Sequence, residues 1–592
     1  MAQPTAPTDR DLTSISEART LVRRAREAAP ALAELSQEQI DAIVDAMAAA
    51  VTPQAEALAR LAHEETGYGN VPDKIQKNLF ASEKIYNFIR PMKTVGVIRR
   101  LEDRKVIEIA EPFGVVAAIV PSTNPTSTAI YKILIAMKAR CPIVISPHPS
   151  AARCITRVAE VMQEAARRAG APDGAISWMT TVTLEGTQEL MRARETAVIL
   201  ATGGMGLVRA AYSAGKPAYG VGPGNAPAYI ESSADVVKAV RDIVTGKTFD
   251  NGLLCSSENS VVCDAVLVDE VKRQFVANGA HFLSASEIDV LGRLLVTPQR
   301  LLNPTLVGRP ATFIAQQAGI AVPPTTRVLI AELTGVGRDF PLSIEKLCPV
   351  LSFYVVKDWR EGCERCKQIL RYGGMGHTMA IHSRNDDIIL QFGLKKPAFR
   401  IVVNTPATLG SIGLTTGLDP SMTLGCGGYG GNITSDNISP LHLLNIKRLA
   451  YETSPAPTRR EAEPASGPSL PKAPSPPRMP GGLAAEPLAR RIDQFLASRG
   501  YRAPAAVDAN RESRTPPATV RNEEAPSPDA APAPVRAPET IQKPAEFVCE
   551  DDVRQAVKQG RQIVIGERTI VTPAARDLGE QHRTFVQASW PR

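Results

Sequence analysis

The feature that most constrains the fold is an alternation between helical patterns and short β-branched runs, which continues to about residue 450. Residues 15–62 have the spacing of helices. Strands are predicted at the apolar runs 106–110, 114–120, 142–146 and 197–201, and Ala- and Arg-rich helical stretches separate the later runs. Strands that alternate with helices form a parallel sheet with helices on both faces. The chain is therefore predicted to be an α/β protein.

Proline marks the place where this pattern stops. Of the 48 prolines, 19 lie between Tyr451 and Phe547. A stretch so poor in apolar residues and backbone donors does not offset the entropy of ordering, so residues 452–547 are predicted to be a mostly disordered linker. The folded body is expected to end near residues 447–451. Residues 548–592, with a helical pattern over 551–560 and a strand-like one over 561–573, are predicted to form a small interaction segment.

Composition argues against several classes of protein. The 68 basic and 61 acidic residues give a net charge of +7 without a dense basic block, so a nucleic-acid partner is not expected. No apolar run approaches the roughly 18 to 20 residues of a membrane span, and the first residues lack the pattern of a secretory signal. Nine irregularly spaced cysteines do not indicate a disulfide framework, which favours the cytoplasm. Cys363 and Cys366 form a single C-x-x-C without a second pair, so no metal site is predicted.

Two glycine clusters suggest that backbone approaches a ligand. The first, at 202–206, follows the predicted strand 197–201 and precedes a helical pattern. Backbone amides at such a helix N-terminus suit a pyrophosphate, although a tight connection that needs glycine for its geometry explains the spacing equally well. The second cluster, at 219–227, follows within one helix length.

Cys255 lies just after an Asn-Gly turn in the polar segment 248–260. A buried, inert cysteine is the common alternative to a reactive one. Here the expected junction between a loop and a helix favours a thiolate, because a helix N-terminus lowers the pKa of a thiol.

The segment ThrPheAspAsnGlyLeuLeuCys (248–255) resembles the cysteine loop of the aldehyde dehydrogenase superfamily. Further segments of the superfamily occur in the expected order at 121–125, 345–350, 423–432 and 442–447. The segment 423–432, together with 220–227 and 373–378, resembles the coenzyme-A-acylating branch, which includes propionaldehyde and acetaldehyde dehydrogenases. The resemblance covers residues 12–450.

This resemblance implies an architecture and an oligomeric state. The expected parts are a Rossmann-like cofactor domain over 12–220, a catalytic domain over 221–403, and a return to the first domain over 404–450. The returning segment is expected to form a bridging β-arm that pairs subunits, which implies a homo-oligomer, either a dimer or a tetramer.

The resemblance also assigns catalytic roles. Cys255 would attack the aldehyde, and the resulting thiohemiacetal would deliver a hydride to nicotinamide and leave an acyl thioester. The Asn124 amide and the Cys255 backbone N–H would stabilise the developing alkoxide. His377 is expected either to deprotonate the thiol of coenzyme A or to be a structural histidine bonded to the backbone.

Cofactor contacts follow from matching motifs. Glu345 would hold the nicotinamide ribose, and Thr202, Gly203 and Gly204 the pyrophosphate. Ser146 and His148 occupy the region where hydrolytic enzymes place a lysine near the adenosine ribose, and the second glycine cluster contributes Gly222 and Gly224. NAD is favoured over NADP, because no basic cluster for a 2′-phosphate is evident.

An absence points to coenzyme A as the co-substrate. Hydrolytic members of the superfamily carry a glutamate 34 residues before the cysteine, which activates water, and this chain has Val221 there. Without that base, attack of water on the thioester should be slow. We therefore predict an acyl-CoA product from a short aldehyde, with propionaldehyde favoured.

Alternatives are an acylating enzyme for acetaldehyde or a substituted aldehyde, a hydrolytic dehydrogenase, and a non-catalytic scaffold. Nothing after Tyr451 is long or apolar enough for the iron-dependent domain of bifunctional aldehyde-alcohol dehydrogenases.

One segment inside the proline-rich stretch has a helical pattern. Over residues 486–500, Leu488, Ile492, Phe495 and Leu496 recur at the spacing of one helix face. This arrangement resembles the encapsulation peptides that bring enzymes into bacterial microcompartments. The predicted location is thus a microcompartment in the cytoplasm, with shell or core proteins as partners. A helix that docks on its own enzyme and a membrane-surface helix are the alternatives.

Overall fold

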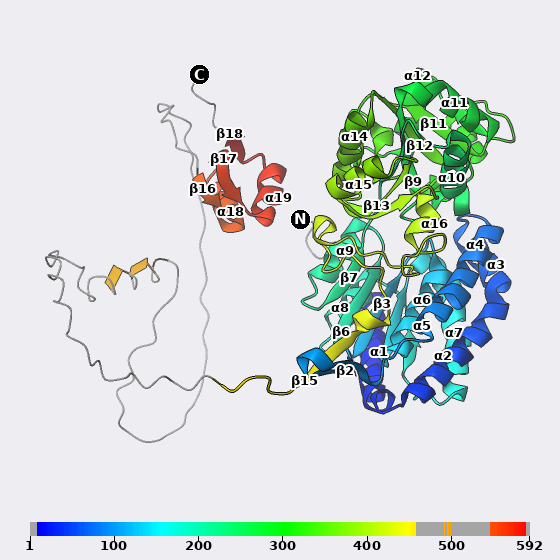
Figure 1. Ribbon diagram of the computed structural model, residues 1–592. Coiled ribbons are helices and arrows are strands. Elements are labelled where there is room, and N and C mark those ends of the chain that lie inside the picture. The colour runs from blue at the N-terminus through cyan, green and yellow to red at the C-terminus, as the bar shows by residue number, and fades with distance from the viewer. Residues whose placement is uncertain (1–8, 457–489, 492–493, 496–497, 499–544, 588–592) are drawn as a thin grey trace, which may run out of the picture. The chain divides into compact units, whose positions relative to one another are not determined.

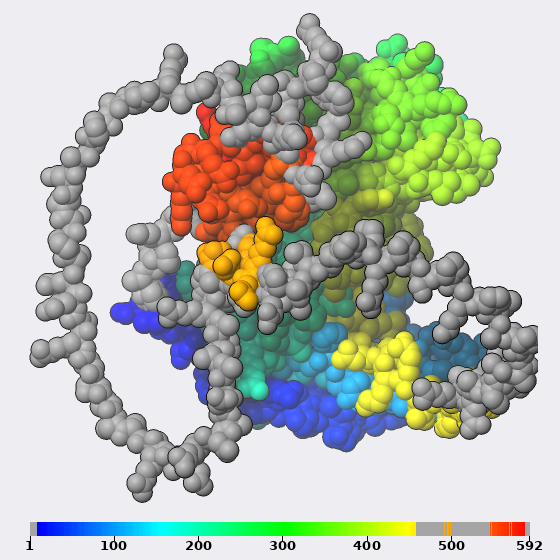
Figure 2. Space-filling model, turned by 90° about the vertical axis from the view of Figure 1, so that its left-hand side faces the viewer, coloured from blue at the N-terminus to red at the C-terminus, as the bar shows by residue number. Residues whose placement is uncertain are grey.

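The computed structural model describes residues 9–456, 490–491, 494–495, 498 and 545–587. The chain divides into two compact units, residues 1–460 and 461–592. Within the first unit, Figures 1 and 2 show two lobes, one mainly blue and cyan and the other mainly green. No helix in the described ranges combines the length and the apolar character that crossing a membrane requires.

The first lobe begins with helices, as the spacing over residues 15–62 predicts. Side chains fix their ends: Ser36 forms a capping box at the start of α2, and Asn70 accepts a bond from the Asp73 amide at the start of α4. A π-helical turn over Phe80–Ile85 joins α4 to α5. The bounds are α1 Asp9–Ala33, α2 Gln37–Val51, α3 Ala55–Thr66, α4 Val71–Leu79 and α5 Tyr86–Ile89.

A parallel five-stranded sheet in the order β5-β4-β3-β6-β7 forms the centre of this lobe. Its strands are β3 Val115–Val120, β4 Ile143–Pro147, β5 Ile176–Trp178, β6 Thr196–Thr202 and β7 Ala218–Val221. The connecting helices are α6 Pro125–Lys138, α7 Ala152–Arg168, α8 Leu184–Arg192 and α9 Met205–Tyr212. The predicted runs 114–120, 142–146 and 197–201 are thus confirmed as β3, β4 and β6.

Both faces of this sheet are buried, which explains why its strands lack polar positions. Along β3, Val115, Ala117 and Ile119 pack on one face, where α1 contributes Val22. The alternate residues of β3 pack on the opposite face, against α6 and α7. A strand with period-2 side chains and helices on both sides becomes uniformly apolar.

The second lobe contains a parallel seven-stranded sheet in the order β10-β11-β12-β9-β8-β13-β14. Its strands are β8 Ala226–Ile230, β9 Glu258–Asp264, β10 Ala280–Phe282, β11 Val328–Glu332, β12 Val350–Val356, β13 Gly376–His382 and β14 Ala398–Val403. Its helices are α10 Val236–Thr248, α11 Val268–Ala277, α12 Ala285–Leu295, α13 Ala311–Ala318, α14 Trp359–Tyr372, α15 Asp386–Lys395 and α16 Ala407–Ser411. One face packs on α10 and α11, and the other on α12 to α15.

A small antiparallel sheet brings distant parts of the first unit together. Its order is β1-β2-β15, with bounds Gly96–Leu101, Val106–Pro112 and Leu444–Ala450, and β2 corresponds to the predicted strand 106–110. On its central strand, Glu108 pairs with Arg99 and Arg448 from the two flanking strands. The chain therefore returns to its N-terminal lobe before the proline-rich stretch.

The second unit holds a three-stranded parallel sheet, β16-β17-β18, crossed by two helices. The bounds are β16 Ala545–Val548, α18 Glu550–Lys558, β17 Ile563–Val571, α19 Pro573–Gln581 and β18 Phe585–Gln587. The predicted helix and strand correspond to α18 and β17. The linker proposed for 452–547, and most of the amphipathic segment 486–500, lie outside the described residues. The α/β class with parallel sheets is confirmed.

Candidate active site

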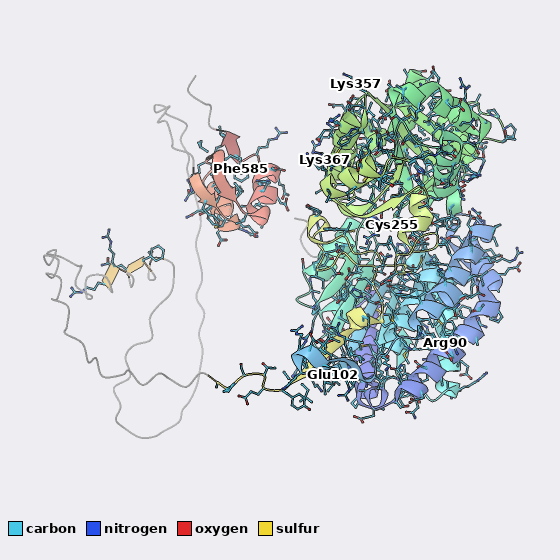
Figure 3. The ribbon with its side chains drawn as sticks, viewed as in Figure 1. Arg90, Glu102, Cys255, Lys357, Lys367 and Phe585 are labelled. Carbon is cyan, nitrogen blue, oxygen red and sulfur yellow. The ribbon has the colours of Figure 1, made fainter. Side chains whose placement is uncertain are left out.

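A cavity of about 480 Å³ opens at the carboxyl ends of β3 and β6. The order of the five strands reverses between these two strands, which is where open α/β sheets bind ligands. The second lobe supplies the opposite wall, so Cys255 lies where the two lobes meet (Figure 3). The sequence-predicted residues in the lining are Asn124, Ser146, His148, Thr202, Gly203, Gly204, Gly222, Cys255 and Glu345.

Cys255 is presented by a strained turn between α10 and β9. Asp250, Asn251 and Gly252 all have positive φ, at 46°, 55° and 76°, and this reverses the chain after the helix. Three residues after Cys255 the chain enters β9 (Glu258–Asp264), so the expected helix N-terminus is absent and the predicted lowering of the Cys255 pKa is wrong. Burial instead raises the pKa of the Cys255 thiol to about 12, with a contribution from the nearby Glu345 carboxyl.

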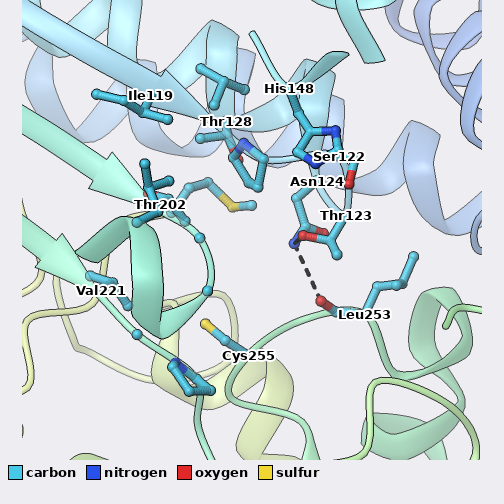
Figure 4. A pocket seen from close by; sticks show the side chains of 18 of the residues that line it. Ile119, Ser122, Thr123, Asn124, Thr128, His148, Thr202, Val221, Leu253 and Cys255 are labelled. Carbon is cyan, nitrogen blue, oxygen red and sulfur yellow. Dashed lines mark hydrogen bonds between the residues drawn. The ribbon is translucent and has the colours of Figure 1, made fainter. Parts of the chain in front are cut away.

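Asn124 lies on the other side of the cavity, immediately before α6. Its Nδ2 donates to the Leu253 carbonyl at 3.3 Å and to the Thr123 hydroxyl at 3.2 Å (Figure 4). Its Oδ1 accepts a 2.6 Å bond from Lys77 Nζ. Because Leu253 is two residues before Cys255, the amide is tied directly to the cysteine loop.

The first glycine cluster forms one wall of the cavity. Thr202 ends β6, and Gly204 is the residue before α9, so this helix begins directly beside the cavity lining. The buried Thr202 hydroxyl has no hydrogen-bond partner within the described part of the chain, and a Cβ added to Gly204 would meet nothing within 4 Å. An open backbone, an unpartnered hydroxyl and a helix start together fit the pyrophosphate of a dinucleotide.

The second glycine cluster approaches the cysteine loop itself. A Cβ on Gly224 would lie 2.1 Å from the Cys255 carbonyl oxygen, so only glycine fits at this contact. The Gly224 N–H donates to Glu345 Oε1 at 2.8 Å. Gly222 and Val221 line the cavity, whereas Gly224 lies behind the lining.

Glu345 and His148 are the titratable groups of the lining other than Cys255. Burial raises the pKa of Glu345 to about 8, so its carboxyl is mostly protonated at neutral pH. Desolvation lowers the pKa of His148, which keeps its imidazole neutral there. Ser146 bonds to the Thr187 hydroxyl at 2.8 Å on the same wall.

His377 lies apart from these residues. It is fully buried at the start of β13 and is not part of the cavity lining. Its Nδ1 is 3.0 Å from the Thr378 hydroxyl, its Nε2 has no partner in the described residues, and burial lowers its pKa to about 3. A Cβ on Gly224 would lie 3.2 Å from the His377 ring, so that glycine packs against both His377 and the cysteine loop.

A buried ionic cluster behind the cavity was not predicted from the sequence. Asp250, in the turn before Cys255, pairs with Lys74 and Lys77 of α4. Lysines on a helix with the spacing i, i+3 usually indicate a solvated face, and their partner is more than 170 positions away. Their partners, Asp250 and Asn124, are identified only by the folded structure.

Known proteins resemble most of the first unit. Residues 10–285 match the model of the aldehyde dehydrogenase family. The bifunctional aldehyde-alcohol dehydrogenase of Escherichia coli K12 is 42% identical over 444 residues, which are 74% of this chain and 50% of that protein. The chain thus spans about half the length of that relative. The acetylating succinate-semialdehyde dehydrogenase of Clostridium kluyveri is 39% identical, covering 73% of this chain and 95% of that one.

Solved structures agree with this result. An acetylating aldehyde dehydrogenase from Geobacillus thermoglucosidasius is 50% identical with a TM-score of 0.75, and the match covers 76% of this chain and all of that one. A propionaldehyde dehydrogenase from the fucose utilisation microcompartment of Clostridium phytofermentans is 29% identical with a TM-score of 0.66, covering 73% and 96%. With the cysteine and asparagine facing one cavity in this fold, the chain belongs to the aldehyde dehydrogenase family.

Proposed function

We propose that the protein oxidises a short, uncharged aldehyde with NAD⁺ and coenzyme A to acyl-CoA and NADH, through a thioester on Cys255. The observation that carries this proposal is the placement of Cys255 and Asn124 on one cavity that has Val221 in its wall. Acetylating relatives, named as such in Clostridium kluyveri and Geobacillus thermoglucosidasius, support the same reaction class.

The chain's own residues account for the first half of the reaction. Cys255 releases its thiol proton to solvent, and as its Sγ bonds to the carbonyl carbon of the aldehyde, the C=O π electrons move onto the oxygen. The Asn124 amide and the Cys255 backbone N–H donate to the oxygen that becomes an alkoxide. Thr202, Gly203, Gly204 and Glu345 would hold the dinucleotide, whose nicotinamide would supply the acceptor for the hydride that leaves the thiohemiacetal carbon. Cys255 then holds the acyl group as a thioester.

The second half depends on which nucleophile reaches the thioester. The side chain of Val221 has no basic group that could activate water. The Glu345 carboxyl is mostly protonated below pH 8, and its Oε1 accepts a hydrogen bond from the Gly224 N–H. A thiol is intrinsically a better nucleophile than water that no base activates, so coenzyme A has the advantage at the thioester. As the sulfur of coenzyme A loses its proton and bonds to the acyl carbon, the bond to Cys255 Sγ breaks, and that sulfur takes up a proton, which regenerates the thiol.

The charge of the lining supports the choice of cofactor and substrate. Within the described cavity wall no lysine or arginine is present. A 2′-phosphate would find no cation, which favours NAD over NADP. An aldehyde with a carboxylate or sulfonate would also lack a partner, whereas Ile412, Met422 and Leu424 offer apolar contacts. Propionaldehyde is the proposed substrate, and acetaldehyde is the alternative.

The reaction is tested by following NADH at 340 nm with and without coenzyme A. Acetaldehyde, propionaldehyde and succinate semialdehyde are compared on the wild-type protein and on Cys255→Ala, with acyl-CoA and free acid measured in the products. We expect sustained turnover of the two uncharged aldehydes only with coenzyme A, and none in the variant. Free acid as the main product, or turnover by Cys255→Ala, would overturn the proposal.

Assembly is proposed at two levels. The outer strands of the β1-β2-β15 sheet have open edges in the described chain, and we propose that they pair copies of the enzyme as a bridging arm. We also propose that residues 486–500 direct the enzyme to microcompartment shell proteins. The apolar spacing of that segment and the microcompartment origin of the Clostridium phytofermentans relative support this second proposal.

A further inference from the structure

Three charged side chains are buried together behind the active-site cavity. Asp250 is 0% exposed, and Lys74 and Lys77 are each 2% exposed. The two lysines are three residues apart on α4 and therefore face the same side of the helix. Both pair with Asp250 Oδ2, Lys74 at 3.1 Å, while Asp250 Oδ1 accepts the Asn70 amide at 2.8 Å. One carboxylate thus anchors two ammonium groups to the turn that presents Cys255.

The two lysines differ in one contact. Lys77 Nζ also donates to Asn124 Oδ1 at 2.6 Å, whereas the ammonium of Lys74 makes no hydrogen bond to Asn124 in the described structure. An ammonium has only donors, so the amide atom that faces Lys77 must be the oxygen. The Nδ2 donors are consequently directed away from Lys77, toward the Leu253 carbonyl and the Thr123 hydroxyl, which both belong to the cavity lining.

We propose that Lys77 is a positioning residue that fixes the direction of the Asn124 amide and joins it to the cysteine loop through Asp250. This inference rests on the proposed function, because it takes the Asn124 amide as the donor to the developing alkoxide. In an enzyme of this type, loss of one such donor slows the chemical step by about 10²–10³-fold. Lys77 makes the shortest bond to the amide, and without it only the longer bonds from Nδ2 to Thr123 and Leu253 oppose a half-turn rotation. A rotated amide would present its oxygen to the alkoxide, which would then lose its donor.

A double-mutant cycle between Lys77 and Asn124 separates this role from a general effect on folding. The variants are Lys77→Met, Asn124→Ala and the two combined, and the rate measured is NADH formation in a single turnover with saturating aldehyde and NAD⁺. We expect each single variant to lose about 10²-fold. The double variant should be no more than about threefold slower than Asn124→Ala, because the amide that Lys77 orients is already gone.

Lys74→Met is the matched control. It removes an equally buried lysine from the same helix and the same carboxylate, and it leaves the bond to Asn124 in place. Its melting temperature is expected to fall about as much as that of Lys77→Met, while its single-turnover rate stays within fivefold of wild type. Lys77→Arg, which retains a charged donor, should recover at least tenfold of the rate lost in Lys77→Met.

The outcomes distinguish the two levels of the proposal. If Asn124→Ala does not slow NADH formation, the assignment of Asn124 in the proposed function fails. If Asn124→Ala is slow but Lys77→Met is not, or if the losses multiply in the double variant, the role of Lys77 fails. Equal slowing by Lys74→Met would also overturn it. If Lys77→Met does not fold, Lys77→Gln takes its place in the cycle. Lys77→Gln is expected to slow single-turnover NADH formation about tenfold in the wild-type background and not to slow it further in the Asn124→Ala background.

Discussion

At the scale of single residues, the chemistry depends on a cysteine that is a thiol at rest. The pKa of Cys255 is raised to about 12 by burial, and the preceding turn gives it no helix N-terminus. At neutral pH only a very small fraction of the protein carries a thiolate at this position. Deprotonation must therefore accompany the binding or the attack of substrate.

This property predicts how the free protein reacts with an alkylating reagent. Because the thiolate is the nucleophile, the rate of Cys255 alkylation by iodoacetamide should rise about tenfold per pH unit from pH 7 to 10, without a plateau. The rate is measured by peptide mass spectrometry of residue 255, which separates it from the other eight cysteines. Denatured protein serves as the reference, with a plateau expected above pH 9. A plateau near pH 7 in the native protein would contradict the raised pKa.

Individual residues of the site could be predicted where a local motif carries them. Cys255, Asn124, Thr202 and Glu345 come from separate motifs, and the fold brings all four to one cavity. The pairing of Lys77 with Asp250 could not be predicted, because Lys77 lies in no motif and the contact depends on how α4 packs against the turn. Asp250 lies within the cysteine-loop segment 248–255, but its neighbours in the sequence do not reveal its partner. His377 is in a motif, yet the structure places it behind Gly224, outside the lining.

At the scale of elements, the loop between β7 and β8 controls the position of the cysteine loop. Gly224 lies so close to Cys255 that a methyl group would overlap its carbonyl oxygen. The same residue donates to Glu345 and packs against His377. Gly224 thus holds the cysteine loop, Glu345 and His377 in place relative to one another.

Gly224→Ala is therefore expected to displace the cysteine loop. A shift of about 1 Å in a catalytic group can cost 10²-fold, and we expect at least that loss in kcat for aldehyde oxidation. Gly393→Ala in α15 is the control: its new methyl group meets nothing within 4 Å, so activity should be unchanged and stability slightly higher. Wild-type kcat in Gly224→Ala would show that the loop can move without cost.

Among the elements, four apolar runs of the first lobe and its small sheet were predicted as strands, whereas the strands of the second lobe, among them β9, β12 and β13 with seven residues each, were not predicted. The runs that became β2, β3, β4 and β6 are five to seven residues long and rich in Val, Ile and Ala. In the second unit, β16 and β18 have four and three residues, too few to show a period. Their strand conformation depends on pairing with β17, which local sequence does not reveal.

At the scale of the whole molecule, composition alone separated the α/β body from the proline-rich stretch. The order of strands in each sheet was not predictable, since it depends on crossovers between distant segments. The first unit contains every residue that lines the cavity. The match to the solved structure from Geobacillus thermoglucosidasius covers all of that chain and 76% of this one. Catalytic activity and targeting to a microcompartment are therefore expected to depend on separate parts of the chain.

Deletion of residues 484–501 tests that separation. Because no residue of the cavity is removed, kcat and KM for the aldehyde should stay within about twofold of wild type. Co-purification with co-expressed microcompartment shell proteins should be lost, since the apolar stripe of Leu488, Ile492 and Phe495 would be missing. The matched control is Arg491→Gln with Asp493→Asn, which changes polar positions of the same pattern and should retain co-purification. If the deleted protein still binds shell proteins, the targeting segment lies in another part of the chain. A large fall in kcat would mean that residues 484–501 stabilise the enzyme itself.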